Sequence, residues 1–494
     1  MRSFRPRPAR EVAAPSSAVA GLGWPALTET DRATLWCPVG GITARANAFW
    51  HGPPIPALQP QDHVNGPAHL EDYFSSFGTR LPNGWTGDED GPMTRALLLE
   101  NPHSNADAAF ARAGIEVIRH RGALDEDDLI SALDDIDILG IRSKTEVTRK
   151  VIEARPDLLA IGTFSIGTNQ IDLEAATNKG VAVFNAPYSN TRSVVELAIG
   201  EIISLSRRLP VQNDALHKGI WEKSAAGSHE VRGRTLGIIG FGNIGMQLSV
   251  VAEALGMRVV FYDTAEKLVI GNARRMNSLE ELLEVADVVT IHVDGRASNK
   301  NFFGEEQFKL MKPGAIFLNL SRGFIVDIDA LAARVKDGSI AGAGVDVFPT
   351  EPRGNGDPFD SVLTGLDNVI LTPHVGGSTE EAQRAIGLFV SEKLVSYFRK
   401  GATDMSINMP QIVDSPALSS RYRIAWVHSN MPGALAKVNQ VFAESGANID
   451  AQQLATQGQI GYMVTDIASN IPEDAVAALA KSPETIRLRV LSRD

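Results

Sequence analysis

The stretch LGIIGFGNIG, residues 236–245, is an apolar run that ends in three glycines. Their spacing, Gly240-x-Gly242-x-x-Gly245, is typical of a strand that turns directly into a helix. Gly240 allows the tight turn, Gly242 allows a pyrophosphate to approach the backbone, and Gly245 allows the helix to pack closely on the strand. The stretch therefore predicts a dinucleotide-binding unit, and the alternative is a plain strand-to-helix turn.

The residues around the glycines favour NAD as this dinucleotide. Asn243 and Ile244 begin the expected helix, whose free amide groups and dipole attract a phosphate anion. The next apolar run, RVVFYD, ends in Asp263, 18 residues after Gly245. A carboxylate there accepts hydrogen bonds from ribose hydroxyls and repels a 2′-phosphate, which favours NAD over NADP. A helix cap is the alternative role for Asp263.

Short apolar runs alternate with helical segments through most of the chain. Six such runs between about 234 and 374 predict a doubly wound nucleotide-binding lobe. Five more between about 94 and 186 predict a second parallel sheet covered on both faces. A long apolar helix at about 191–209 is expected to join the two lobes. Beyond a Pro/Ser-bearing segment at 409–420, the order β-α-β-β-α-β predicts a small ferredoxin-like domain.

The predicted fold class is therefore α/β, with two Rossmann-like doubly wound lobes and a C-terminal ferredoxin-like domain. The expected divisions are an N-terminal extension (1–92), a substrate-binding domain (93–189, completed by 377–410), a nucleotide-binding domain (190–376), a linker (411–420) and the small domain (421–494).

Residues 1–92 differ in composition from the rest of the chain. They hold 12 of the 26 prolines and show no sustained helical or strand period. The Arg-rich start suggests a transit peptide, but prolines at positions 6 and 8 would break the helix that such peptides form. We expect a disordered or non-native extension, and a further hypothesis is that translation starts at Met93.

Composition excludes several classes of function. A formal charge of -12 argues against a nucleic-acid-binding surface. The single cysteine, Cys37, allows neither an intrachain disulfide nor a cysteine-based zinc site, and it fits a cytoplasmic protein. No uncharged apolar run reaches the length of a membrane-spanning helix. We predict no metal site and no membrane partner.

Polar residues follow three of the expected strands, where ligands bind in open α/β sheets. They are Arg322, Asp346 with the nearby Glu351, and His374. A histidine, with an unperturbed pKa of roughly 6.5, can take the proton of a 2-hydroxy acid while a hydride leaves. Glu351 could fix its tautomer, and Arg322 could grip a substrate carboxylate. Taken singly, each residue is more often structural, but behind a dinucleotide fingerprint we favour catalysis.

The motifs GIIGFGNIG, NLSRGFIVD, GAGVDVFPTEP and LTPHVGGST together resemble the D-2-hydroxyacid dehydrogenase family. With GIRSKTEVT, FSIGTNQIDL and FNAPYSNTRSVVELAIGEI, the chain from about 93 onward is similar to the phosphoglycerate dehydrogenase branch that carries one C-terminal ACT domain. The resemblance implies that Arg322, Glu351 and His374 are catalytic, and that Asp346 holds the carboxamide side of the nicotinamide. It further places these residues around NAD: Asn243, Ile244, Asp263, Leu320, Ser321, Arg322, Asp346, His374, Val375, Gly376 and Gly377.

A phosphorylated 2-hydroxy acid needs a basic site beyond Arg322. Arg142, Ser143 and Lys144 follow an expected strand of the first lobe, and Asn190 lies at the lobe junction. Solvated charges on a turn are the alternative, but the family resemblance favours phosphate binding. Two rival functions stay open, namely action on another 2-oxo acid such as 2-oxoglutarate, and an NAD-sensing protein related to corepressors of this fold.

The C-terminal domain and the oligomer are expected from the resemblance. ACT domains bind amino acids between paired copies, which makes L-serine the expected effector, with His428, Asn430 and Asn448 as its contacts. A plain turn capped by Asn430 is the alternative. The family forms homo-oligomers, so we expect a tetramer in which Trp221 of GIWEKSAAG anchors an interface, unless it is an ordinary core aromatic.

Overall fold

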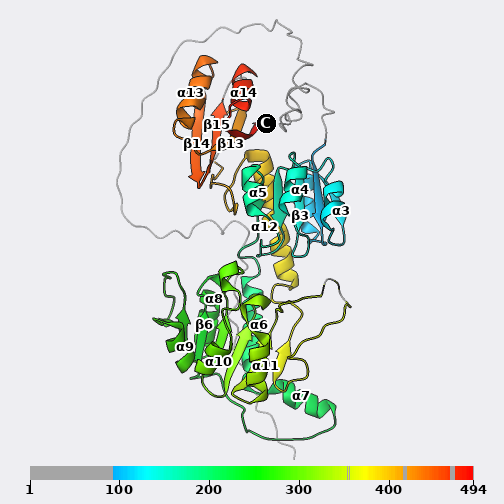
Figure 1. The fold of residues 1–494 in the computed structure, drawn as a ribbon, viewed down its shortest axis with the longest axis vertical. Helices are drawn as coiled ribbons and strands as arrows, with labels where there is room; N and C mark the ends of the chain where they lie inside the picture. Colours follow the sequence, from blue (N-terminus) through cyan, green and yellow to red (C-terminus); the bar gives the residue numbers. More distant parts are fainter. Residues whose placement is uncertain (1–92, 353, 355, 415–419, 468–472, 493–494) are drawn as a thin grey trace, which may run out of the picture. The chain divides into compact units, whose positions relative to one another are not determined.

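The computed structural model describes residues 93–352, 354, 356–414, 420–467 and 473–492. All of them belong to one unit, Asn65–Asp494. The expectations for residues 1–92 lie outside this part of the chain. The described residues form three sheets, shown in Figure 1.

The first sheet is parallel and has the strand order β2-β1-β3-β4-β5. Its strands are β1 (Arg95–Leu99), β2 (Glu116–His120), β3 (Ile138–Ile141), β4 (Ala160–Thr163) and β5 (Ala182–Phe184), and its connecting helices are α2 (Asn105–Arg112), α3 (Glu126–Ala132), α4 (Arg149–Ala154) and α5 (Leu173–Asn178). Leu97 and Leu99 face one apolar cluster, whereas Ala96 and Leu98 face another. Both faces of this sheet are therefore covered, as predicted.

The helices of this lobe begin where the sequence offers a capping side chain. Asp125, Thr148 and Asp172 accept hydrogen bonds from backbone N–H groups in the first turns of α3, α4 and α5. These bonds satisfy donors that the helix itself cannot pair.

The second sheet is also parallel and has the order β12-β11-β10-β9-β6-β7-β8. Its strands are β6 (Thr235–Ile239), β7 (Arg258–Tyr262), β8 (Arg274–Arg275), β9 (Val288–Ile291), β10 (Ala315–Asn319), β11 (Ile340–Val345) and β12 (Val369–Leu371). The chain leaves β6 on one side for β7 and returns on the other side for β9, so the strand order reverses at β6. This reversal creates the crevice in which doubly wound folds bind nucleotides.

The connecting helices of the second sheet are α8 (Asn243–Ala254), α9 (Leu279–Val285), α10 (Glu305–Leu310) and α11 (Ile328–Lys336), with short 3-10 helices at Ala297–Asn299 and Gly323–Ile325. The sequence predicted six strands here, and the structure adds the two-residue edge strand β8. The predicted helix at 191–209 is shorter than expected. It is α6 (Thr191–Ser206), and Arg208, with a left-handed φ of 54°, separates it from α7 (Leu209–His217).

Helix α12 (Glu380–Lys400) follows the last strand of the second sheet but packs against α2 and β4 of the first lobe. Thr379 caps its beginning, and Gly401, with a φ of 66°, ends it in the left-handed conformation that glycine tolerates best. The helix therefore carries the chain from the nucleotide-binding lobe back to the first lobe.

The third sheet is antiparallel with the order β14-β15-β13-β16. Its elements are β13 (Tyr422–Ser429), α13 (Ala434–Glu444), β14 (Ile449–Gln457), β15 (Ile460–Ile467), α14 (Glu473–Ala480) and β16 (Thr485–Ser492). The order β-α-β-β-α-β agrees with the predicted ferredoxin-like domain.

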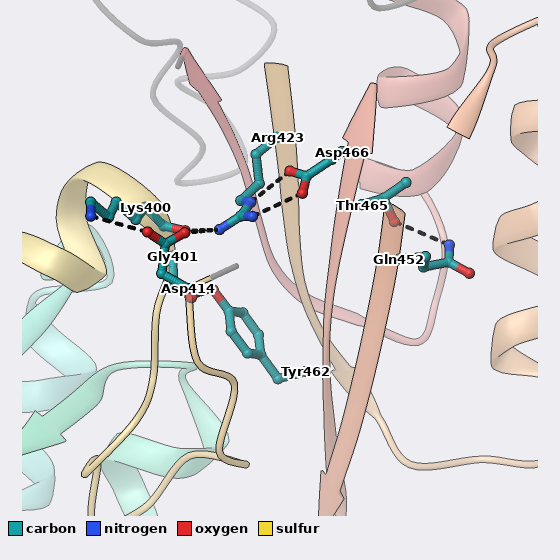
Figure 2. A network of polar contacts seen from close by, with 8 residues as sticks. All are labelled: Lys400, Gly401, Asp414, Arg423, Gln452, Tyr462, Thr465 and Asp466. Carbon is teal, nitrogen blue, oxygen red and sulfur yellow. Dashed lines mark hydrogen bonds and ion pairs between the residues drawn. The ribbon is translucent and has the colours of Figure 1, made fainter. Parts of the chain in front are cut away.

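This small domain holds the end of α12 through hydrogen bonds, most of which Figure 2 shows. Arg423 donates to both oxygens of Asp466, at 2.7 and 2.8 Å, and to the carbonyl oxygen of Lys400 at 2.7 Å. The hydroxyl of Tyr462 donates to the carbonyl oxygen of Gly401 at 2.7 Å. The last carbonyl groups of a helix lack partners within it, and here side chains of β13 and β15 supply them.

Within the described residues, no helix combines the length and the apolar character needed to cross a membrane. The same part of the chain holds no group of three or more His, Cys, Asp or Glu side chains that could bind a metal ion.

The buried pair of Arg423 and Asp466 yields a stability prediction. Asp466→Ala leaves Arg423, which has no exposed surface, with one of its two acidic partners, and we expect the free energy of unfolding to fall by about 3–5 kcal/mol. The control is Glu116→Ala, which breaks an exposed pair with Arg95 and should cost less than about 1 kcal/mol. Chemical unfolding followed by circular dichroism measures both, and equal losses would contradict this account.

Candidate active site

Three neighbouring strands of the second sheet carry the predicted catalytic residues at their carboxyl ends. Arg322 follows β10, Glu351 lies in the loop after β11, and His374 follows β12. Because β10, β11 and β12 are adjacent in the sheet, these residues meet at one edge.

His374 and Glu351 form a direct hydrogen bond, with 2.9 Å between Nδ1 and Oε2. The other carboxylate oxygen of Glu351 accepts a hydrogen bond from the backbone N–H of Phe348 at 3.2 Å. Burial raises the pKa of Glu351, but the hydrogen bond and charge of His374, the Phe348 N–H and the charge of Arg322 lower it overall. The carboxylate is therefore ionised at neutral pH, and it fixes the ring so that Nε2 is the nitrogen left for a substrate.

The loop that carries His374 is held by Asp346, which is 1% exposed. His374 has a left-handed φ of 53°, and its N–H donates to the carbonyl oxygen of Asp346 at 2.8 Å. The Asp346 carboxylate accepts hydrogen bonds from the Thr372 hydroxyl at 2.6 Å and from the N–H groups of Val375 and Gly376 at 2.8 Å each. Burial raises the pKa of Asp346, and these hydrogen bonds oppose the rise. Asp346 thus anchors the loop, and its predicted contact with nicotinamide stays a prediction.

Arg322 lies half-buried between the two lobes. Its Nη1 donates to the carbonyl oxygen of Ser321 at 2.8 Å, and a Cβ added at Gly167 of the first lobe would lie 2.6 Å from Nη2. Burial lowers the pKa of Arg322, while the charges of Glu351 and Asp294 raise it. The guanidinium is thus a cation within the electrostatic range of Glu351, the hydrogen-bond partner of His374.

The glycine loop fits a dinucleotide. Gly240 has a φ of 92°, and a Cβ there would lie 2.7 Å from the backbone of His292. A Cβ at Gly245 would lie 2.4 Å from the Gly240 carbonyl oxygen, so the helix packs as closely as predicted. Gly242 is the N-cap of α8, has no side chain to fill the helix end, and has open space around its Cα. The amide groups of Asn243 and the next residues can therefore receive a pyrophosphate.

Asp263 follows β7 beside this loop. Its Oδ2 accepts a hydrogen bond from the N–H of Phe241, and its Oδ1 accepts one from the N–H of Ala265, both at 2.8 Å. The carboxylate keeps further lone pairs for ribose hydroxyls. Among the other residues predicted around NAD, Ile244, Gly245, Leu320, Ser321 and Gly376 are wholly or partly buried, whereas Val375 is 36% exposed.

The basic loop after β3 is organised by a residue that the sequence analysis missed. The N–H groups of Ser143 and Lys144 donate to Oε2 of Glu100 at 3.0 Å each, and the N–H of Thr145 donates to Oε1 at 2.8 Å. Glu100 follows β1, the neighbour of β3, and has a left-handed φ of 63°. Because the Glu100 carboxylate already accepts the hydrogen bonds of these amide groups, an anion at this loop would contact the side chains of Arg142 and Lys144.

Asn190 lies at the start of α6, where the lobes join. Its Oδ1 is buried without a hydrogen-bond partner among the described residues, and a Cβ at Gly377 would lie 2.3 Å from its Nδ2. The structure therefore brings Asn190 next to the loop of His374, although sequence separates them.

The predicted effector residues do not share one environment. His428 lies within β13, is 1% exposed, stacks on Trp426 at 4.2 Å and faces Gly461 of β15. The strand extends to Ser429, so this ring lies in the interior of the domain. Asn430 is exposed and donates to the carbonyl oxygen of Gly458 at 3.1 Å, and Asn448 is exposed just before β14.

Known proteins are similar to this chain. Residues 199–376 match the family described as D-isomer specific 2-hydroxyacid dehydrogenase, NAD binding domain, and residues 424–487 match an AHAS small subunit-like ACT domain. D-3-phosphoglycerate dehydrogenase of Escherichia coli K12 is 49% identical over 398 residues, which are 80% of this chain and 97% of the relative. The protein of the same name from Haemophilus influenzae is 48% identical over 403 residues, 81% of this chain and 98% of the relative.

The chain belongs to the D-3-phosphoglycerate dehydrogenase family. It is an NAD-dependent oxidoreductase with an ACT domain. The solved D-lactate dehydrogenase of Aquifex aeolicus, complexed with NAD and lactic acid, is similar with a TM-score of 0.57 and 27% identity, covering 64% of this chain and all of that one. The family assignment made from the motifs is thereby confirmed, and the predicted fold class and cofactor agree with it.

Asp263 yields a prediction for cofactor affinity. In Asp263→Ala both the expected ribose acceptor and the support of the Phe241 N–H are lost, so we expect the Kd for NADH to rise about 10–100-fold. Fluorescence titration with NADH measures this change. Glu266→Ala, an exposed acid three residues further along, is the matched control and should bind normally. An unchanged Kd in Asp263→Ala would mean that this carboxylate only supports the loop.

Proposed function

We propose that the chain oxidises 3-phospho-D-glycerate to 3-phosphohydroxypyruvate with NAD, the first step of phosphorylated L-serine biosynthesis. The observation that carries the proposal is the 2.9 Å hydrogen bond between His374 and Glu351 at the edge of an NAD-binding sheet. The relatives named D-3-phosphoglycerate dehydrogenase support this choice of substrate. The cytoplasm is the compartment we expect for it.

The arrangement can move one proton while a hydride leaves. Nε2 of His374 takes the proton of the substrate hydroxyl while the C–H bond of the carbon that carries this hydroxyl breaks. The electron pair of the C–H bond leaves with the hydrogen as a hydride. Bound NAD supplies the acceptor for this hydride. The ionised Glu351 stabilises the imidazolium that forms, and Arg322 binds the substrate carboxylate and polarises the oxygen that becomes a carbonyl. In the reverse direction His374 returns the proton.

The phosphate of the substrate would lie over the loop after β3. Glu100 already accepts the three amide hydrogens there, so the phosphate is bound by side chains and not by the loop backbone. Arg142 supplies a planar fork of donors and Lys144 a mobile point charge, both of which suit a phosphate. Asn190 is a further candidate contact from the lobe junction.

Two other functions compete with this proposal. If the substrate is another 2-oxo acid such as 2-oxoglutarate, the rate should depend only weakly on the side chains of the basic loop. An NAD-sensing protein related to corepressors would need no proton-transfer pair, and the hydrogen-bonded imidazole and carboxylate favour an enzyme over such a binder.

The first test is NADH formation, followed by absorbance, with 3-phosphoglycerate and NAD. We expect Arg142→Ala and Lys144→Ala to raise the KM for 3-phosphoglycerate about 10–100-fold, because each loses a charge-assisted contact. Reduction of 2-oxoglutarate, which lacks the phosphate, should change far less in the same variants.

The matched control is Lys150→Ala, which removes an exposed lysine paired with Glu126 and Asp127 in the same lobe. Equal losses on both substrates would speak against a phosphate site. A wild-type protein that binds NADH but forms none from 3-phosphoglycerate would contradict the proposed function itself.

We further propose that L-serine is the effector and binds to the ACT domain. Asn430 and Asn448 are both exposed at the ends of strands of that domain, where their amide groups can bind the α-amino and α-carboxylate groups of an amino acid. His428 is buried, so in this proposal it supports the loop of Asn430 from inside the domain.

Asn430→Ala and Asn448→Ala should therefore keep NADH formation without serine and lose at least tenfold in sensitivity to it, because each removes a hydrogen-bonding group from the site. Initial rates over a series of serine concentrations provide the measurement. Gln440→Ala, on the exposed side of α13, is the control and should remain sensitive. Unchanged inhibition in both asparagine variants would exclude this site.

A homo-oligomer is the assembly we propose, with a tetramer expected from the family resemblance. The segment from α7 to Trp221 leaves large apolar side chains exposed, and Trp221 itself is 82% exposed. Helix α7 has no buried residue within its own chain. Burial of Trp221 in its own chain would have counted against a role as interface anchor, and its exposure supports that role.

A further inference from the structure

Glu201 is a buried acid that the proposed mechanism does not use. It lies on α6 and is 3% exposed, and neither carboxyl oxygen has a hydrogen-bond partner in the part of the chain that the structure describes. Burial, followed by the charge of Asp346, raises the pKa of Glu201 to about 8. An unpaired carboxylate in such a place is costly, which favours the neutral acid.

The neighbouring strand leaves room for this side chain. A Cβ added at Gly344 of β11 would lie 2.3 Å from Oε2 of Glu201, and a Cβ at Gly342 would lie 2.4 Å from Nδ2 of Asn368. Residues two apart in a strand face the same side, so both glycines open the face that α6 covers. Asp346 is two residues beyond Gly344, about 7 Å further along the chain.

The charged surroundings of Glu201 are simple. Helix α6 packs against α7, α8, β10, β11 and β12, and these strands contain no titratable side chain within their bounds. The titratable groups on the packed helices are Asp214 and His217 of α7 and Glu253 of α8, together with Arg192 and Glu196 of α6 itself. Among described residues, Asp346 alone acts on Glu201 by its charge, and His374 in turn acts on Asp346.

Asp346 is the anchor of the His374 loop, so its surroundings affect the catalytic geometry. Its carboxylate accepts three hydrogen bonds and has its full acceptor strength only as an anion. A second negative charge on Glu201 would repel it and favour protonation of one of the two acids. A neutral Glu201 leaves the anchor ionised and undisturbed.

We propose that Glu201 is a positioning residue, which stays protonated during turnover and keeps Asp346 as the single negative charge behind the His374 loop. The kinetic test of this proposal rests on the proposed function, whereas the test by thermal unfolding does not. A purely structural acid, indifferent to its own ionisation, is the competing explanation.

The test compares pH profiles of wild type and Glu201→Gln, whose amide imitates the neutral acid at every pH. At pH 7 the variant should keep kcat/KM for 3-phosphoglycerate within about threefold. Between pH 7 and pH 9 wild-type Glu201 ionises, so the ratio of kcat/KM, variant over wild type, should rise by up to about tenfold. Using the ratio cancels the titration of groups that both proteins share.

Glu196→Gln is the matched control, since Glu196 lies on the same helix but is exposed and paired with Arg192. Its ratio to wild type should stay flat over the same pH range. A flat ratio for Glu201→Gln as well would overturn the proposal. So would a loss of more than tenfold at pH 7 with normal NADH binding, because it would mean that the ionised acid is required.

Thermal unfolding gives a readout that does not need the substrate. The pKa of folded Glu201 lies above its ordinary value, so this acid stabilises the fold most below its unfolded pKa, and that stability is lost as pH rises towards 8. The Tm of wild type should therefore fall relative to that of Glu201→Gln between pH 5 and pH 8. A constant difference in Tm overturns the proposal even if 3-phosphoglycerate is not the substrate, while absent turnover alone rejects only the proposed function.

Discussion

The candidate site depends on one buried carboxylate, that of Asp346, which holds the loop of the histidine. His374 has a backbone conformation that costs a non-glycine residue about 1 kcal/mol or more, and such strain persists only where the surroundings determine it. The Asp346 carbonyl and carboxylate together accept four hydrogen bonds from residues 372–376. Without this anchor the loop would lose the four hydrogen bonds that hold the imidazole opposite Glu351. The position of His374 relative to Glu351 is thus determined mainly by the backbone of its loop.

The sequence predicted those parts of the molecule whose causes are local. The glycine spacing around Gly240, the acid at Asp263 and the polar residues after β10, β11 and β12 all lie in short motifs, and the structure brings them to one edge of a sheet. The βα order followed from hydrophobic periodicity, and the ferredoxin-like order of the third sheet did so too. These features need no knowledge of distant contacts.

The features that sequence reasoning missed arise from contacts between distant segments. Glu100 is an ordinary acid at a strand end until β3 lies beside β1 and offers three amide groups. Glu201 looks like one polar position in an apolar helix, and only the packing on β11 shows that it is buried without a partner. The burial of His428 was also missed, because it depends on the packing of Trp426 and on the neighbouring strand β15. A glutamate within an apolar helical stretch, facing a Gly-x-Gly strand, is the signal that could have pointed to Glu201.

Helix α12 carries one more consequence. It starts six residues after His374, runs for 21 residues, or about 31 Å, and ends where Arg423 and Tyr462 of the ACT domain hold its last carbonyl groups. Each residue of a helix adds about 1.5 Å of length and about 100° of rotation, so the number of residues sets both the distance and the relative orientation of its two ends. The loss or gain of a single residue in α12 would rotate its last carbonyl groups away from Arg423 and Tyr462. Insertions and deletions should therefore be tolerated in loops of this chain and not in α12.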